Sequence, residues 1–313
     1  MRNCLNRTHI EGYLYEHNLE SKVSGENSKN PGTQYITGTV SVATDNEMLN
    51  IVSVHFSYVT PTTSKGGANA TYAALNNIVS GAAGSVMKDG KEKAAKVRID
   101  SAIGLNEFYT DRNGTTELVS TKRNEGGFIH LVDALDEDVK KRNTFECDML
   151  ITGATRFEAN EEKQIPERVV VKGYIFDFRK ALLPVEFTAT NENAMNYFEG
   201  LEASGKEPVF TKVWGRQISE TIKKEVKEES AFGEDFVKVV ESNRKDFLIT
   251  GASKETYLWD DESSITAEEV KKAVADRETY LASIKKRQDE YQASKNQTKA
   301  AAFNINNNSE FNF

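Results

Sequence analysis

The chain has 313 residues, of which 38% are hydrophobic, and it carries a formal net charge of −8 at pH 7. This length exceeds the usual size of one domain, so two domains are the first expectation. The acidic balance excludes a protein that coats nucleic acid through net positive charge, and any polyanion site must be a local patch. No apolar run approaches the roughly 18 residues of a membrane span, so we expect a cytoplasmic protein without a membrane partner.

Residues 1–135 have the pattern of a five-stranded unit. Strand-like alternation through 6–20, 35–47 and 50–59 predicts a three-stranded meander. Residues 71–80 can form a short helix, and two further strands follow, joined by a turn at Asn113-Gly114. Five strands with a helix between the third and the fourth are the order of an OB-fold, a small closed barrel that commonly binds oligonucleotides.

A second unit follows a charged break at residues 133–143, which we take as the linker. Residues 144–258 again show strands, a helix over 191–204 and further strands, and they predict a second OB-fold-like barrel. A charged stretch at 219–245 interrupts this pattern, and we expect it to be a helical insertion.

The C-terminal region has a helical pattern. Thr266 and Glu269 form a capping box, and we expect a helix within residues 259–298. Polar residues interrupt its apolar seam, so it should lie on the protein or pair weakly with a partner. The Asn- and Ala-rich residues 299–313 predict a disordered tail. The expected fold class is therefore mainly β with α additions: two tandem OB-fold-like barrels, a C-terminal helix and a disordered tail.

One short strand pattern occurs twice, as IEGYLYEH at 10–17 and as VKGYIFDF at 171–178. Alternate side chains of a strand face opposite ways, so each copy has an aliphatic face that includes its glycine and a second face of rings. We interpret each copy as the first strand of a barrel, bent at its glycine. The rings then face outwards, where either protein covers them or bases stack on them at about 1–3 kcal/mol per base.

A different echo, LITGATR at 150–156 and LITGASK at 248–254, we attribute to a shared β-rich composition. The two cysteines, Cys4 and Cys147, form no Cys-x-x-Cys pair, which predicts neither a disulfide framework nor a zinc site. The four histidines are far apart, and the sequence contains no phosphate-binding loop, nucleophile elbow or zinc-protease motif. We expect no enzyme, no catalytic residue, no metal and no cofactor.

Three motifs within the first 115 residues stand in a familiar order. The first strand reads NRTHIEGYL from Asn6, the second ends in Ala-Thr at 43–44, and the fourth leads into Tyr109-x-Asp111-x-x-Gly114. In these motifs the chain resembles the bacterial and phage single-stranded DNA-binding proteins, which show N-x-V-x-L-x-G-x-L and W-x-D-x-x-G at these places. The resemblance implies an OB-fold whose outer rings stack on unpaired bases and whose Lys and Arg neighbours hold phosphates.

The chain departs from this family in several ways. Only Tyr109 takes a family stacking position, where tryptophan is usual, and the stacking ring of the third strand falls at His55 or Phe56. The family usually has one barrel per chain and oligomerises, so a second barrel could replace part of an oligomer. The family also recruits replication proteins through an acidic tail ending in Pro-Phe, and the corresponding residues here are Glu310, Phe311 and Phe313.

In the second unit, Lys212, Trp214 and Arg216 alternate on one strand face and place a large ring between two cations, as a single-strand groove needs. Solvated surface charges and an ordinary core tryptophan are the alternatives. The candidate nucleic-acid-binding residues are Tyr13, Tyr15, His55, Phe56, Lys96, Arg98, Phe108, Tyr109, Arg112, Lys122, Arg123, Tyr174, Phe176, Phe178, Arg179, Lys212, Trp214 and Arg216.

These observations predict a protein that binds single-stranded DNA without strong sequence preference and protects it during replication, recombination or repair. The resemblance and the two-barrel layout suggest a phage source, with the protein in the host cytoplasm. The expected partners are single-stranded DNA, replication or recombination proteins bound through the tail, and further copies in a homo-oligomer. The alternative is a structural or adaptor protein whose exposed rings form an assembly interface.

Overall fold

The structure is a computed structural model that describes residues 3–112, 115–160, 165–228, 232, 236–259 and 264–306. The predicted turn at 113–114 and residues 307–313 of the predicted tail, including Glu310, Phe311 and Phe313, lie outside these residues. Residues 299–306, which were also predicted to be disordered, are instead the last residues of a long helix. The strands are β1 (Asn6–His17), β2 (Glu20–Val23), β3 (Gln34–Ala43), β4 (Ile51–Val59), β5 (Lys96–Arg112), β6 (Thr115–Val132), β7 (Asn143–Phe157), β8 (Arg168–Phe176), β9 (Leu182–Ala189), β10 (Val209–Glu228) and β11 (Phe236–Ala252). The helices are α1 (Ala70–Val79), α2 (Val86–Asp89), α3 (Glu192–Gly200) and α4 (Ala267–Asn306), with short 3₁₀ turns η1 (Lys91–Lys93) and η2 (Val139–Lys141).

Two barrels follow one another along the chain. In barrel 1, β1 pairs with β3, β3 with β4, β4 in parallel with β6, β6 with β5, and β5 again with β1. In barrel 2, β7, β8, β9, β11 and β10 close in the same order, again with one parallel pair, β9 with β11. Helices α1 and α3 each lie between the third and fourth strands of a barrel, which is OB-fold order. The expected fold class is confirmed.

The first strands of the two barrels join them into one 11-stranded sheet, because β1 and β7 pair in antiparallel fashion. Each of these strands has a bulge, after Leu14 in β1 and after Ile151 in β7. Thr8 and Phe145 lie the same number of residues before their bulges, and they are paired with each other. The two barrels are therefore related by an approximate two-fold axis that passes between these two residues, as in the isologous interface of a homodimer.

Each barrel has its own hydrophobic core. Ile10, Leu14 and Phe56 lie in the core of barrel 1, to which α1 contributes Leu75 and Ile78. The α1 helix begins at Asn69, whose side chain accepts hydrogen bonds from two backbone N–H groups of the first turn. The core of barrel 2 comprises Phe145, Cys147, Met149, Val171, Ile175, Phe187, Phe198, Val213 and Phe247, with Phe198 from α3.

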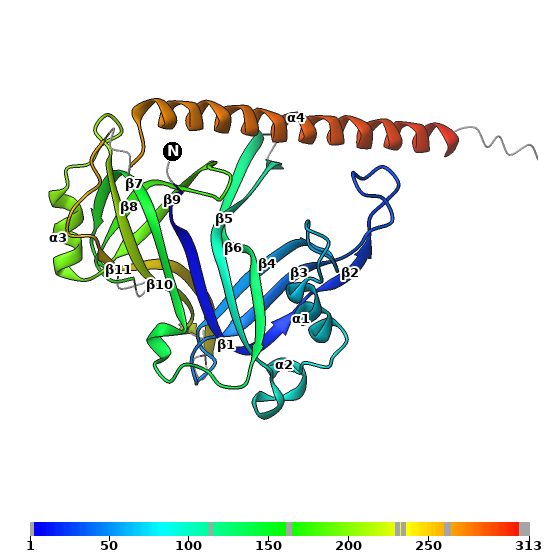
Figure 1. Cartoon of the computed structure of the whole chain (residues 1–313), viewed down its shortest axis with the longest axis horizontal. Coiled ribbons are helices and arrows are strands. Elements are labelled where there is room, and N and C mark those ends of the chain that lie inside the picture. The colour runs from blue at the N-terminus through cyan, green and yellow to red at the C-terminus, as the bar shows by residue number, and fades with distance from the viewer. Residues whose placement is uncertain are drawn as a thin grey trace, which may run out of the picture.

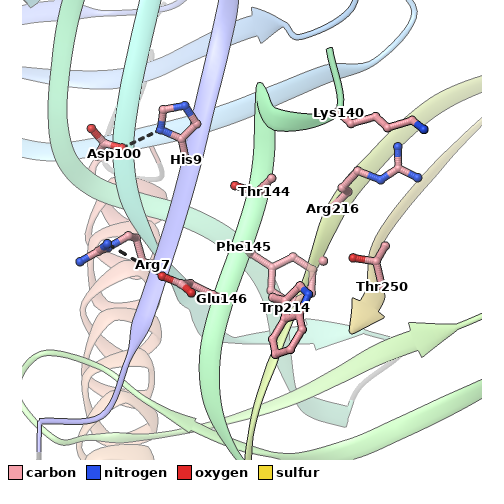
Figure 2. Close-up of a pocket in the computed structure, with 11 residues that line it drawn as sticks. Arg7, His9, Asp100, Lys140, Thr144, Phe145, Glu146, Trp214, Arg216 and Thr250 are labelled. Carbon is pink, nitrogen blue, oxygen red and sulfur yellow. Dashed lines mark hydrogen bonds and ion pairs between the residues drawn. The ribbon is translucent and has the colours of Figure 1, made fainter. Parts of the chain in front are cut away.

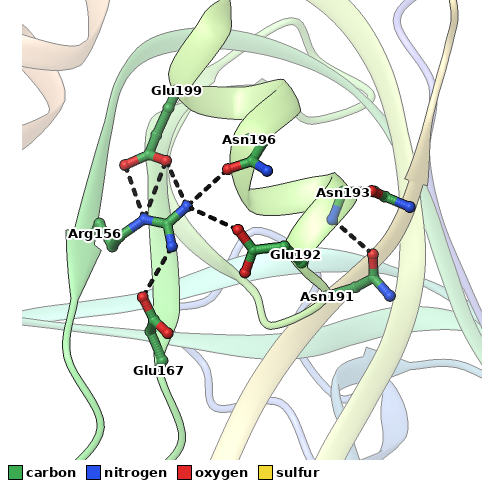
Figure 3. A network of polar contacts seen from close by, with 7 residues as sticks. All are labelled: Arg156, Glu167, Asn191, Glu192, Asn193, Asn196 and Glu199. Atoms are coloured by element: carbon green, nitrogen blue, oxygen red, sulfur yellow. Dashed lines mark hydrogen bonds and ion pairs between the residues drawn. The ribbon is translucent and has the colours of Figure 1, made fainter.

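The outer side of α3 is held by a polar network around Arg156 of β7 (Figure 3). The Arg156 guanidinium donates to Glu199 and Asn196 of the helix and to Glu167, which lies just before β8. Carboxylates on both sides raise the pKa of Arg156, and the guanidinium in turn lowers the pKa of Glu199. Because the network is solvent-exposed, we assign it a role in orienting α3 rather than a large share of stability.

A buried amide cluster fixes the barrels against each other. The side chains of Asn124 in β6 and Gln217 in β10 exchange two hydrogen bonds, of 2.8 and 3.0 Å. The Gln217 carbonyl oxygen also accepts from Asn143 and Asn50, and the Ser219 N–H donates to Asn50. Buried amides that satisfy one another rigidify a contact, because breaking any pair leaves polar groups unpaired. The two barrels consequently form one body.

The C-terminal segment covers the outer face of barrel 2 (Figure 1). Ile265, Val270 and Ala273 pack against Phe176 and other apolar side chains of this face. The predicted capping box is present, since Thr266 and Glu269 exchange hydrogen bonds at the start of α4. Further along the helix, Arg277 forms an ion pair of 2.5 Å with the buried carboxylate of Glu107 in β5. The helix thus lies on the protein, as one of the two sequence-based alternatives expected.

Two expectations about barrel 2 are wrong. Residues 219–228 and 236–245 belong to the long paired strands β10 and β11, not to a helical insertion. Ile222 and Val226 are spaced by four residues, which fits both a helix and a strand, and pairing between the two strands decides for the strand. The second Gly-Tyr pattern is in β8, the second strand of its barrel, whereas the first is in β1. The two copies are therefore not equivalent by position.

The two glycines nevertheless share a physical role. A Cβ on Gly12 would lie 2.0 Å from the Ala43 carbonyl oxygen, and one on Gly173 would lie 2.2 Å from that of Leu150. In both places a neighbouring strand passes too closely for any side chain. Each glycine of the repeat therefore lies where the first two strands of a barrel approach each other closely. Gly12 belongs to the first of these strands, and Gly173 belongs to the second.

The close approach at Gly173 predicts the effect of adding one methyl group. We expect Gly173→Ala to destabilise the protein by about 1–3 kcal/mol, because backbone must move to admit the Cβ. Gly153→Ala, in the adjoining strand, is the matched control, because a Cβ there would meet nothing within 4 Å. Urea unfolding of the two variants measures the difference; equal midpoints would contradict the strand approach described here.

Candidate nucleic-acid interface

The outer surfaces of the two barrels merge where β1 pairs with β7. Across this seam β10, β7, β1 and β5 are neighbours, and the outward residues of all four strands share one surface, which we call the junction face. A groove of about 690 Å³ lies on it (Figure 2). Its lining residues are Arg7, His9, Asp100, Lys140, Thr144, Phe145, Glu146, Trp214, Gly215, Arg216 and Thr250.

Trp214 provides a fixed aromatic surface in this groove. It pairs across the strands with Gly251 of β11, and a Cβ on Gly251 would lie 2.4 Å from the indole ring. The indole therefore covers the bare backbone of the glycine, an arrangement in which an aromatic residue protects a strand glycine. Because Trp214 remains 39% exposed, the rest of its surface is open to the groove. Of the two interpretations of this tryptophan, the structure supports the exposed one over the core.

Positive charge is concentrated around this ring. Lys140 and Arg216 lie on the same side of the groove (Figure 2) and neither forms an ion pair with any described residue. Lys212 instead forms an ion pair of 2.8 Å with Glu146, which partly neutralises its charge. Arg7, with a side chain 64% exposed, is 3.9 Å from the same carboxylate. On a protein of net charge −8, this is a local cationic patch of the kind the composition requires.

Asp100, the acid on the far side of the groove, also has basic side chains close to it. Asp100 of β5 lies 2.8 Å from the Nδ1 atom of His9 and 3.8 Å from the Nε atom of Arg98. Directly beside Asp100, across the β5–β6 pairing, is Phe128, which is 66% exposed. Sequence reasoning missed Arg7, His9, Lys140 and Phe128, because only the pairing of strands far apart in sequence places them on the same surface as Trp214.

The candidate residues of β1 and β4 divide by face. Tyr13 and Tyr15 are half-buried on the outside of barrel 1, and the Lys91 ammonium lies 5.5 Å from the Tyr13 ring centroid. His55 is half-buried on the outside of β4, and burial together with Arg123 lowers its pKa. Phe56 is fully buried in the core and cannot stack on a base without unfolding of the barrel.

The candidates of β5 and β6 lie mostly on a hairpin that reaches from barrel 1 to barrel 2. Lys122 is half-buried against the other barrel: its ammonium donates to the Glu186 carbonyl oxygen and lies 5.4 Å from the Phe247 ring centroid. Burial lowers the pKa of Lys122, and its ammonium is engaged between the barrels, so the phosphate contact predicted for it stays a prediction. Arg123 forms an ion pair with Glu125.

The other candidates on this hairpin are spread along it. Lys96 donates to the Asp133 carbonyl oxygen, and Arg98 is part of the outer surface beside Asp100. Phe108, which is 45% exposed, and the half-buried Tyr109 lie toward the tip, away from the groove. The side chain of Arg112 lies outside the described residues.

The candidates of β8 lie beyond the groove, near the part of barrel 2 that α4 and the residues before it cover. Phe176 is 1% exposed and packs under the C-terminal segment, and the half-buried Tyr174 packs against the same cluster. Protein, and not bases, covers Phe176, so its predicted stacking role is wrong. Phe178 is 87% exposed in the turn after β8, with the Arg179 guanidinium 5.0 Å from its ring centroid. The structure thus brings together only Lys212, Trp214 and Arg216 from the predicted set.

Among the described residues, no group of three His, Cys, Asp or Glu side chains is placed to hold a metal ion. Within the same part of the chain, no helix is long and apolar enough to cross a membrane.

With this geometry in view, the family model of YorF matches residues 5–309. The chain belongs to the YorF family. A solved structure, a deletion mutant of the single-stranded DNA binding protein from Thermus aquaticus, is similar with 11% identity and a TM-score of 0.46, covering 85% of this chain and 100% of that chain. Comparison with curated protein sequences finds no match.

The contact between Trp214 and Gly251 predicts how the ring responds to a single methyl group. In a Trp259→Phe background, where Trp214 is the remaining tryptophan, Gly251→Ala should displace the indole. We expect a shifted emission maximum, stronger quenching by acrylamide and a stability loss of about 1–3 kcal/mol. Gly205→Ala is the control, because a Cβ there meets nothing within 4 Å. An unchanged emission and quenching constant would show that the ring does not lie on Gly251.

The lowered pKa of His55 predicts a pH dependence of stability. The unfolded state, with a pKa near 6.5, takes up the proton before the folded state does. Stability from the neutral imidazole is therefore present above pH 6.5 and is lost as the pH falls below it. We expect His55→Asn to flatten the decline in unfolding free energy between pH 7 and pH 5, measured by urea titration. Parallel curves for variant and parent protein would contradict the shift.

Proposed function

We propose that this protein binds single-stranded DNA without strong sequence preference, and that the junction face is its binding surface. The observation that carries the proposal is the indole of Trp214, which lies on Gly251, with the cations Lys140 and Arg216 together on one side of the groove (Figure 2) and without an ion-pair partner among the described residues. An immobilised ring offers a stacking surface at low entropic cost, and nearby cations suit the phosphates of a stacked nucleotide.

The chemistry of the groove favours unpaired bases. Stacking requires that a base expose its π-face, and duplex bases already stack on each other. The polar groups beside Trp214 include the hydroxyls of Thr144 and Thr250, which donate and accept equally and cannot distinguish one base edge from another. A site of rings, cations and hydroxyls therefore tolerates any base.

The remainder of the protein limits binding to this patch. With a net charge of −8, most of the surface repels a polyanion, so affinity depends on the local cations and on stacking. We assign the protein a role in covering exposed single strands during replication, recombination or repair, because a bound base is shielded from pairing and from enzymes.

The proposal is tested by titrating the protein with poly-dT. We expect Trp214→Ala to weaken binding by about 1–3 kcal/mol, the value of one stacked base. Arg216→Ala should weaken it less and reduce the salt slope by about 0.7, since one phosphate contact is lost. Trp259→Ala, which removes the other tryptophan, and Lys206→Ala, on an exposed loop, are matched controls. If Trp214→Ala and its controls bind alike, the junction face is not the site.

A second candidate function has one observation in its favour. Phe178 is 87% exposed in the turn after β8. It lines a partly apolar pocket of about 350 Å³, to which β5 and α4 also contribute. An exposed ring next to a concave apolar surface suits a protein contact, as in an adaptor. In that case Phe178→Ala would change the mass of the assembly in solution, and poly-dT would not bind to the parent protein.

A further inference from the structure

Two exposed rings, Trp214 on the junction face and Phe128 of β6 at its edge, lie in cross-strand pairs that are equivalent around the approximate two-fold axis, but they are opposite members of those pairs. His9 of β1 and Glu146 of β7 are equivalent by their distance from the bulges. His9 pairs with Asp100, which pairs with Phe128. Glu146 pairs with Trp214, which pairs with Gly251. Each barrel therefore has one ring in this cross-strand pair. In barrel 1 the ring is Phe128 on the fifth strand, and in barrel 2 it is Trp214 on the fourth strand.

The separation of the rings follows from the sheet. Trp214 is in β10 and Phe128 is in β6, and the strands between them are β7, β1 and β5. With about 4.8 Å per strand spacing and an offset of two residues along the strands, from Arg7 to His9, the two rings are about 20 Å apart along the surface. A stacked strand advances about 3.4 Å per nucleotide, so this distance corresponds to about six nucleotides.

The surface between the rings is suited to a polyanion. One row across it consists of Thr144, His9 and Asp100, none of which carries a bulky side chain that would block a path. Asp100 lies 3.8 Å from Arg98 and Glu146 lies 2.8 Å from Lys212, so the repulsion of phosphate by these two acids is reduced. Arg7 is largely exposed in the middle of the path. The barrels cannot move apart, because the buried amide cluster holds them together.

We infer that one DNA strand contacts both rings at once, Trp214 in barrel 2 and Phe128 in barrel 1, so that the ligand is a continuous unpaired stretch of about six nucleotides or more. This inference rests on the proposed function. Binding at one ring raises the effective concentration of the same strand at the other only if the strand is long enough to reach it.

The experiment compares oligo-dT of three, five, eight and twelve nucleotides on the full chain. The parent protein should show a step in affinity between the short and the long ligands, beyond the gradual rise from added statistical positions. Phe128→Ala should abolish the step, weakening binding of the eight-nucleotide ligand about 5- to 150-fold, the effect of one stacked base. It should leave the three-nucleotide ligand, bound at Trp214, within about twofold of the parent. Trp214→Ala should weaken both.

Controls make the outcomes distinct. Phe178→Ala removes a ring that is even more exposed than Phe128 but lies outside the groove, and it should change nothing. Phe128→Tyr keeps a ring and should restore the step, which separates stacking from any structural effect of Phe128→Ala; thermal unfolding checks each variant. If the ligands bind but show no step, or if Phe128→Ala weakens short and long ligands equally, the inference is overturned while the proposed function stands. If none of the ligands binds, the proposed function itself fails.

Discussion

The antiparallel pairing of β1 with β7 is the interaction on which the rest of the molecule depends. It uses the first half of each first strand, whose edge the second strand of its own barrel leaves free, to join the two barrels into one sheet, and its centre at Thr8 and Phe145 sets the approximate two-fold axis. Because of it the fourth strands of both barrels become near neighbours on one surface. The same axis directs the long hairpin of each barrel toward the other, where Gln217 is buried and Lys122 is half-buried. A homodimer of single barrels would obtain this geometry by symmetry; here the covalent chain provides it.

Whether an aromatic residue on the outer face of the sheet is buried or exposed depends on what packs against it. Phe176 is on an outer strand face, but the C-terminal segment covers that face, and the ring belongs to an additional core. Trp214 is on an equally outer face, yet it has bare backbone at Gly251 on one side and solvent on the other. Apolar exposure has a cost in solvation, and the protein removes that cost for Phe176 while leaving it for Trp214 and Phe128. Rings elsewhere, such as Phe178, are exposed too, but Trp214 and Phe128 lie on one continuous surface with local cations, which is where we expect a ligand.

Local sequence patterns predicted most of the fold but only part of the candidate site. Period-two alternation, the short helices and the capping box at Thr266 are local signals, and each predicted its element correctly. The strand β10 was misread beyond residue 219 because Lys- and Glu-rich text has a helical propensity that pairing with β11 overrides. Lys212, Trp214 and Arg216 were recognised because they share one strand. Phe128 and Arg7 were not, since their proximity to Trp214 arises from pairing between strands far apart in sequence.

The echo LITGATR and LITGASK illustrates what composition alone leaves undecided. The two segments have nearly equal sequences and lie in one barrel, in β7 and β11, yet the surroundings of their glycines differ. A Cβ on Gly153 would have open space around it, whereas Gly251 lies under the indole of Trp214. The difference comes from the partner strands, because Gly251 pairs with Trp214 of β10 and Gly153 pairs with Lys172 of β8. Because a ring on glycine backbone is held without blocking its outer face, Gly251 rather than Trp214 alone makes this position a platform. The equivalent pair in barrel 1, Asp100 and Phe128, holds its ring beside a paired carboxylate, so the two halves of the junction face differ in how firmly each would hold a base.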